Sequence, residues 1–94
     1  MPHLLVRHSV DDYARWRPIF DDHTSFRAEY GSTGGLVFRN ADDPAEVVML
    51  FEVEDLDRAR EFVGSDGLRE AMQSAGVVGR PDIIFLNDEN PAAS

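Results

Sequence analysis

The feature that most constrains this chain is the order in which strand-like and helix-like segments follow one another. Short runs rich in β-branched and aliphatic residues predict strands at residues 3–8, 36–39, Glu46–Val53 and 82–86. Apolar residues spaced three and four apart predict helices at residues 13–30, 55–63 and 68–75. The order is therefore βαββαβ. Helix-length connections and one hairpin predict an α+β, ferredoxin-like sandwich, in which helices cover one face of an antiparallel four-stranded sheet.

Proline and glycine set the expected boundaries. Pro18 lies within the first helical stripe, so we expect it to bend that helix or delay its start. Gly31 follows the last residue of the stripe, at the position where helices commonly end. With 94 residues the chain predicts one domain, over residues 1–86. Residues 87–94 are polar and contain Pro91, which predicts a flexible C-terminal tail.

The predicted sheet carries apolar side chains on both faces. Because side chains alternate along a strand, each strand divides into two sets. The set expected to face the helices is Leu4, Val6, Leu36, Phe38, Val47, Met49, Phe51, Val53, Ile83 and Phe85. The opposite set is Leu5, Val37, Val48, Leu50, Ile84 and Leu86, with Arg7, Arg39 and Glu52 among them. A solvated outer face would be polar, so this pattern predicts a homodimer through the sheet face. The alternative is a monomer with an apolar outer face.

Charge and composition exclude several classes of function. The formal net charge is −9, which disfavours nucleic acid and anionic membranes as partners. No apolar run approaches the ~20 residues of a membrane span, so a cytoplasmic location is expected. The chain has no cysteine, and all nine of its basic residues are arginine. Thiolate chemistry and lysine Schiff bases are therefore excluded.

Three segments resemble a known superfamily. They are HSVDDYARWRPIF at residues 8–20, EVVMLFEV at 46–53 and AMQSAGVVGRPDIIFL at 71–86. Together they resemble the dimeric α/β-barrel superfamily and, within it, the small antibiotic-biosynthesis-monooxygenase-like proteins. The resemblance implies two sheets packed face to face. Its members include cofactor-independent oxygenases of aromatic polyketides, lactone isomerases, polyketide cyclases, haem-handling proteins and non-catalytic proteins, so it does not assign one reaction. No member's catalytic motif matches here residue by residue.

A candidate site is expected between the sheet and the first helix. His8 ends the first strand on the face of Leu4 and Val6, and His23 shares a helical stripe with aromatic residues. A histidine can move a proton at neutral pH, and a guanidinium can hold an enolate or carboxylate. The predicted catalytic residues are His8 and His23. The predicted substrate-binding residues are Trp16, Phe20, Arg27, Met49, Phe51 and Phe62.

Each of these residues also has a structural interpretation. His8 could cap the following helix or bond a backbone carbonyl, and His23 could lie at the solvent edge. Arg27 could pair with a surface acid, and the aromatic residues could be plain core. The three histidines make no compact ligand motif, so no metal and no cofactor are predicted.

Three functions therefore stay open. The first is a cofactor-independent enzyme of monooxygenase, cyclase or isomerase type, acting on a small aromatic or polyketide-like molecule. The second is a non-catalytic small-molecule-binding or structural dimer. The third is a regulatory module whose acidic surface docks a basic partner. The sequence does not decide between catalysis and binding.

Overall fold

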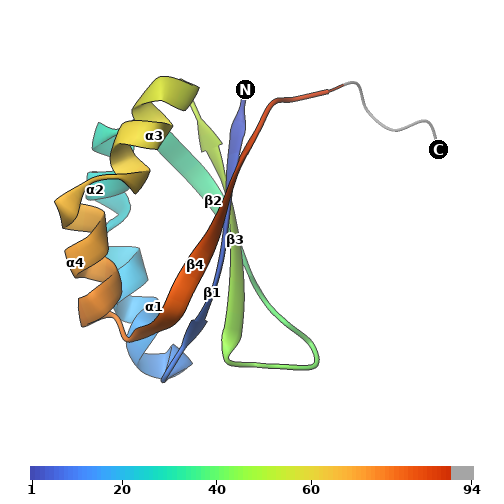
Figure 1. Cartoon of the computed structure of the whole chain (residues 1–94), viewed down its shortest axis with the longest axis vertical. Coiled ribbons are helices and arrows are strands. Elements are labelled where there is room, and N and C mark those ends of the chain that lie inside the picture. The colour runs from blue at the N-terminus through green and yellow to red at the C-terminus, as the bar shows by residue number, and fades with distance from the viewer. Residues whose placement is uncertain (90–94) are drawn as a thin grey trace.

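The computed structural model describes residues 1–89 and has the predicted ferredoxin-like architecture (Figure 1). The strands are β1 (His3–Val10), β2 (Ser32–Arg39), β3 (Glu46–Val53) and β4 (Val77–Leu86). The helices are α1 (Tyr13–Asp22), α2 (Thr24–Glu29), α3 (Leu56–Val63) and α4 (Asp66–Ser74). The sheet order is β2-β3-β1-β4, and each neighbouring pair is antiparallel. Of the expected tail, residues 87–89 follow β4 without regular structure, and the rest lies outside the described residues.

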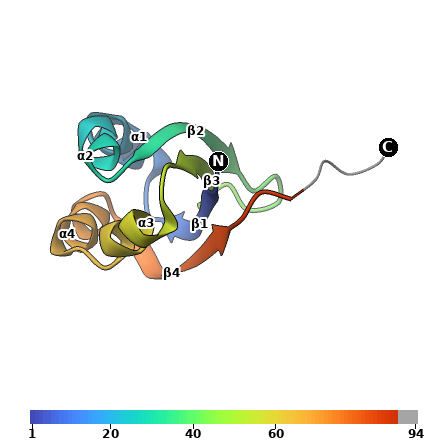
Figure 2. The same cartoon turned by 90° about the horizontal axis from the view of Figure 1, so that it is seen from above.

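The helices form one layer against one face of the sheet. Seen from above, α1 and α2 lie side by side with α3 and α4, and both pairs pack on the same side of the strands (Figure 2). The core lies between the layers. Its buried members are Leu4, Val6, Val10, Trp16, Val47, Met49, Phe51, Val53, Ala59, Phe62 and Ala75. None of the helices within residues 1–89 is long and apolar enough to cross a membrane.

Side-chain caps explain where three helices begin. Asp12 Oδ1 accepts a hydrogen bond of 3.0 Å from the amide of Ala14 at the start of α1. Asp55 caps α3 and Ser65 caps α4 in the same way, through an oxygen that accepts from a backbone amide. These oxygens satisfy amide groups that have no partner within the helix.

The first helical segment differs from the prediction. The helix begins at Tyr13 and runs through Pro18, so the proline does not delay its start. Pro18 lacks the amide that would bond the carbonyl of Ala14, but both residues are exposed, and water can solvate that carbonyl. The predicted single helix instead divides at His23, which ends α1 and precedes α2.

The side-chain phase predicted for β2 is wrong. Leu36 pairs with Leu50 and Phe38 with Val48, so both lie on the face away from the helices, where they are 57% and 52% exposed. Val37 pairs with Met49 and packs against the core, and the Arg39 guanidinium carbon lies 4.1 Å from the centroid of the Tyr13 ring. Three consecutive apolar residues show no alternation, so the pattern did not determine the phase. The register also shifts between Thr33 and Leu36, as a β-bulge produces.

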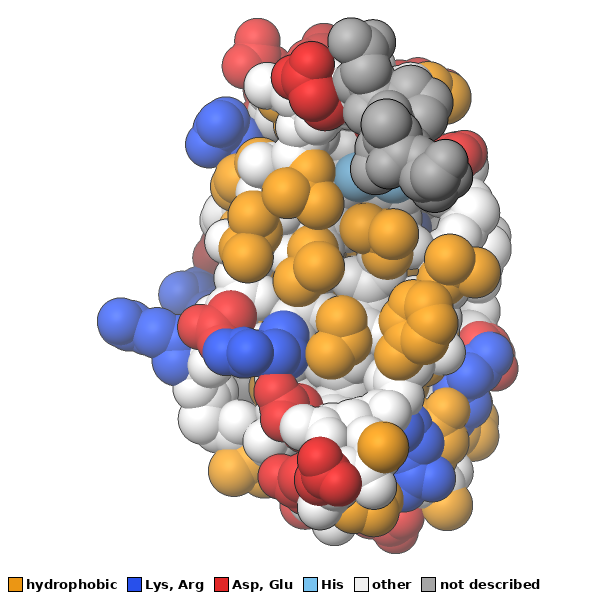
Figure 3. Space-filling view, turned by 90° about the vertical axis from the view of Figure 1, so that its right-hand side faces the viewer, with side chains coloured by type: hydrophobic (Ala, Val, Ile, Leu, Met, Phe, Trp, Pro, Cys, Tyr) orange, Lys and Arg blue, Asp and Glu red, His pale blue; other side chains and the backbone are white. Residues whose placement is uncertain are grey.

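With this correction the apolar surface of the sheet is larger than expected. We call it the outer face, and it consists of Leu5, Leu36, Phe38, Val48, Leu50, Ile84 and Leu86. Figure 3 shows hydrophobic side chains gathered across the middle of this face, with charged side chains beside them. Arg7 lies among these charges and forms ion pairs with Asp82 at 2.6 Å and with Glu46 at 3.2 Å.

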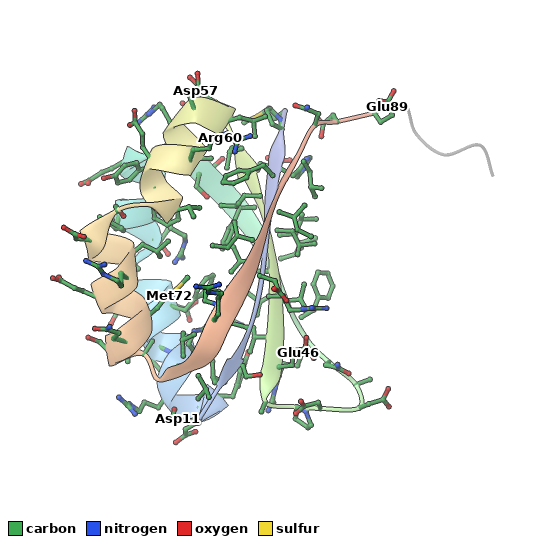
Figure 4. The ribbon with its side chains drawn as sticks, viewed as in Figure 1. Asp11, Glu46, Asp57, Arg60, Met72 and Glu89 are labelled. Atoms are coloured by element: carbon green, nitrogen blue, oxygen red, sulfur yellow. The ribbon has the colours of Figure 1, made fainter. Side chains whose placement is uncertain are left out.

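Gly76 joins α4 to β4 where this turn meets the end of β1. Its carbonyl accepts a 3.0 Å hydrogen bond from the amide of Asp11, which Figure 4 shows at that end of the sheet. Gly76 has a φ of +81°, and a Cβ there would overlap the Asp11 carboxylate. The positive φ favours glycine here, whereas the half-exposed Asp11 side chain could turn aside from a Cβ.

Candidate functional site

A cavity lies between the helix layer and the sheet. It has a volume of about 70 Å³ and is lined from β1, β3 and all four helices. All eight predicted site residues line it: His8, Trp16, Phe20, His23, Arg27, Met49, Phe51 and Phe62. The structure thus brings the candidates together around one space, while their chemical roles stay predictions.

Aromatic rings form the wall of the cavity on the α1 side. Trp16 and Phe20 lie one helical turn apart, and their rings stack with centroids 4.8 Å apart. Phe51 of β3 continues this surface, with its centroid 6.0 Å from that of Phe20. These stacked rings give the cavity an apolar lining.

His8 lies deep in the cavity wall. Its side chain is 5% exposed, and its ring meets that of Trp16 edge-on with centroids 5.8 Å apart. Nδ1 has no hydrogen-bond partner within residues 1–89. Burial lowers the pKa of His8, because it disfavours the charged imidazolium. The cap of α1 is Asp12, so His8 does not serve as that cap.

This burial predicts a pH dependence of stability. The pKa of His8 is lower in the folded chain than its ordinary value of 6.5, so the unfolded chain binds more protons as pH falls below 6.5. The contribution of His8 to the free energy of unfolding is fully present above pH 6.5 and is lost as the pH falls below that value. The free energy of unfolding should therefore fall more steeply from pH 7.5 to pH 5 in the wild type than in His8→Phe. Urea denaturation across this range tests it, and parallel pH profiles would contradict it.

His23 lies at the junction of α1 and α2. Its Nδ1 is 2.8 Å from the carbonyl oxygen of Ile19, which can only accept, so Nδ1 carries the hydrogen. The neutral ring therefore has its lone pair on Nε2, for which no protein partner is found within residues 1–89. An imidazole held in this tautomer can accept a proton at Nε2.

Arg27 of α2 turns back over the aromatic wall. Its guanidinium carbon lies 3.9 Å from the centroid of the Phe20 ring. Nη1 donates to the carbonyl of Phe20 at 2.9 Å, and Nη2 donates to Thr24 Oγ1 at 3.2 Å. Burial lowers the pKa of Arg27, although a guanidinium stays charged in proteins. Within residues 1–89 no carboxylate lies within ion-pair distance of it, so the surface pairing considered above is not formed there.

The two histidines lie at different ends of this wall. His8 packs on Trp16, whereas His23 follows Trp16 by seven residues, or about 10 Å along a helix axis. Arg27 stacks on Phe20 and lies toward the His23 end. The cavity therefore pairs a cation with one imidazole and places the other imidazole at a distance.

The helix α4 supplies lining residues that were not among the predicted site residues. They are Leu68, Ala71 and Met72, and Ala75 lines the cavity directly after the end of the helix. Figure 4 shows Met72 extending from α4 toward the sheet. These residues share the apolar stripe of the predicted helix at residues 68–75, so their helical spacing could have predicted that they face the cavity. Ile19 and Phe26 also line the cavity. Within residues 1–89 no three His, Asp or Glu side chains are placed to hold a metal ion.

Solved structures with the same fold come from antibiotic-biosynthesis-monooxygenase-like proteins. A proposed antibiotic biosynthesis monooxygenase from Bordetella bronchiseptica matches with a TM-score of 0.79 and 13% identity, over 95% of this chain and 97% of that one. SnoaB, a cofactor-independent oxygenase from Streptomyces nogalater, matches with a TM-score of 0.69 and 17% identity, over 97% of both chains. A proposed antibiotic biosynthesis monooxygenase from Caulobacter crescentus matches with a TM-score of 0.70 and 16% identity, over 95% of this chain and 90% of that one.

No protein-family model and no curated protein matches the sequence. The structural likeness extends over nearly the whole chain, and the predicted resemblance is confirmed at the level of fold. The chain has the ferredoxin-like fold of the antibiotic-biosynthesis-monooxygenase-like structures.

Proposed function

We propose that this chain is a cofactor-independent enzyme of monooxygenase, cyclase or isomerase type that removes a proton from a small aromatic or polyketide-like molecule. One observation carries the proposal: His23, whose Nε2 has no partner in the described part of the chain, and Arg27, which has no carboxylate partner there, line one apolar cavity. That combination can remove a proton and stabilise the anion that remains.

The reaction would begin with the substrate in the apolar cavity, beside the stacked rings of Trp16 and Phe20. His23 Nε2 accepts a proton from an acidic C–H or O–H group, and the electron pair stays on the substrate as an enolate or phenolate. Arg27 stabilises this negative charge in a site of low polarity, where such an interaction is strong. His8 is neutral at pH 7 and offers a second nitrogen at the other end of the ring wall. The likeness to SnoaB supports a fold compatible with cofactor-free chemistry, and at 17% identity it supports no more.

Proton exchange tests the proposal without knowledge of the natural substrate. Benzoylacetate is a suitable probe, since it is aromatic, enolisable and anionic. The wild type should accelerate exchange of its acidic hydrogen with deuterated water, followed by NMR. His23→Gln should reduce that acceleration by at least about 100-fold.

His3→Gln is the matched control, since His3 pairs with Asp88 and does not line the cavity. It should exchange at the wild-type rate. Equal exchange rates in the wild type and in His23→Gln would reject His23 as the base. No acceleration by the wild type would favour a non-catalytic binding or structural dimer, for which the small volume of the cavity is the supporting observation.

The outer face supports a homodimer as the second part of the proposal. Leu36, Phe38 and Ile84 are 57%, 52% and 49% exposed on a surface to which three further leucines and Val48 contribute. A continuous apolar surface of this kind is typical of an interface. The ion pairs of Arg7 are made within one subunit, so a second copy can cover the face without leaving that charge unpaired. A two-fold axis would join the two outer faces.

A further inference from the structure

We infer that the cavity takes a compact monoanion, a single-ring or short-chain carboxylate, whose anionic group lies against Arg27. This inference rests on the proposed function and names its substrate class. It follows from the charge of the cavity lining and from the size of the space.

The cavity is positively charged in a strongly acidic chain. The chain has eighteen acidic residues and a net charge of −9. Among the residues from 1 to 89 that line the cavity, none is Asp or Glu, and Arg27 is the one arginine. The local charge therefore has the opposite sign to that of the whole chain, which is the arrangement that selects an anion.

Arg27 has N–H groups that bond no acceptor within residues 1–89. A guanidinium carries five N–H groups, and the structure shows two of them bonded, to the carbonyl of Phe20 and to Thr24 Oγ1. Asp21 is near enough to act on Arg27 electrostatically, but its carboxylate pairs with Arg17 at 3.1 Å. A partly buried charge without a contacting counter-ion is costly, and a carboxylate matches the planar fork of the guanidinium. A ligand carboxylate would supply the acceptor that residues 1–89 do not.

The volume limits the ligand to a small molecule. The space is about 70 Å³, whereas a dry cavity of roughly 150 Å³ holds one benzene molecule and drug-sized ligands need at least about 300 Å³. A single ring can therefore enter only with part of the molecule at the mouth, and fused rings do not fit. Ala71 and Met72 of α4 form the opposite wall and set this limit.

The binding position follows from these two limits. The guanidinium lies over one ring of the stacked Phe20–Trp16 pair, so a ligand whose carboxylate meets Arg27 would lie beside that pair rather than on the face of Phe20. The end of the molecule away from the carboxylate would then point toward His8, which packs on Trp16.

Ligand binding tests the inference, with benzoate, benzamide and 2-naphthoate as probes. Isothermal titration or NMR titration should show that the wild type binds benzoate at least ten-fold more tightly than benzamide, which has nearly the same shape and no charge. 2-Naphthoate should bind more weakly than benzoate. Arg27→Met should remove the preference for benzoate over benzamide.

Three further variants separate the effect of charge from the effect of space. Arg60→Met is the matched control, since Arg60 also stacks on a ring, that of Phe85 at 4.3 Å, but does not line the cavity. It should leave benzoate affinity unchanged. Ala71→Leu should fill the space and abolish binding of both benzoate and benzamide, whereas Met72→Ala should admit 2-naphthoate.

Equal affinity of the wild type for benzoate and benzamide would overturn the inference that the ligand is an anion. Tighter binding of 2-naphthoate than of benzoate would overturn the assignment of size, and failure of all three probes would overturn both. Two measurements on the wild type distinguish this inference from the proposed reaction. If the wild type prefers benzoate to benzamide but exchanges no protons of benzoylacetate, the anion site stands and the enzyme proposal fails.

Discussion

Replacing Trp16 by alanine should lower the free energy of unfolding by about 3–5 kcal/mol, because it removes a large buried ring and leaves a cavity. The Trp16 side chain is 3% exposed and packs against three rings, those of His8, Tyr13 and Phe20. It therefore links β1 to α1. Urea denaturation measures the loss, and it should be followed by circular dichroism because Trp16 is the only tryptophan.

Trp16→Phe is the matched variant. It keeps an aromatic ring at the centre of the cluster, so its loss in free energy of unfolding should be less than half of that of Trp16→Ala. If Trp16→Ala lost less than about 1 kcal/mol, the ring would contribute little to the core, and the cavity wall built on it would have to be reconsidered.

Placing a charge at the centre of the outer face should have the largest effect on assembly. Leu50 pairs with Leu5 on one side and with Leu36 on the other, so it lies in the middle of the apolar surface. Leu50→Arg would bring two like charges into a two-fold interface. We expect the dimer dissociation constant to rise at least 100-fold, which corresponds to about 2.7 kcal/mol.

Native mass spectrometry measures this change, since one subunit has a mass of 10.5 kDa. The wild type should have twice that mass, and Leu50→Arg should have the mass of one subunit. Gln73→Arg is the matched control, because it adds the same charge at an exposed position of α4. A monomeric wild type would contradict the dimer proposal, as would a Leu50→Arg variant that stays dimeric.

Much of the site could be predicted because the relevant residues lie in regular elements. Leu4, Val6 and His8 alternate along one strand, so the core side of His8 follows from two apolar neighbours. Trp16, Phe20 and His23 follow helical spacing and therefore share one side of the chain. The alternation along the strand and the spacing along the helix were therefore sufficient to predict that these residues share one cavity.

The remaining features depend on contacts that a local pattern does not contain. The phase of β2 depends on a bulge before Leu36, and three adjacent apolar residues fit either face equally well. The division of the first helix at His23 depends on local hydrogen bonds rather than on Pro18. The distance between His8 and His23 follows from packing of β1 on α1, which also places Arg27 near only one of them.

The alternation of side chains along β1 and β3 also puts the cavity and the proposed dimer interface on opposite faces of the sheet. Leu4, Val6 and Met49 face the helices, whereas Leu5 and Leu50 face the other way, on the same two strands. A second copy on the outer face would be kept from the cavity by the thickness of the sheet. Each subunit would then be autonomous in its chemistry. A mixed dimer with one Arg27→Met subunit should retain one fully competent site, so such an assembly would show half-stoichiometric binding without cooperativity.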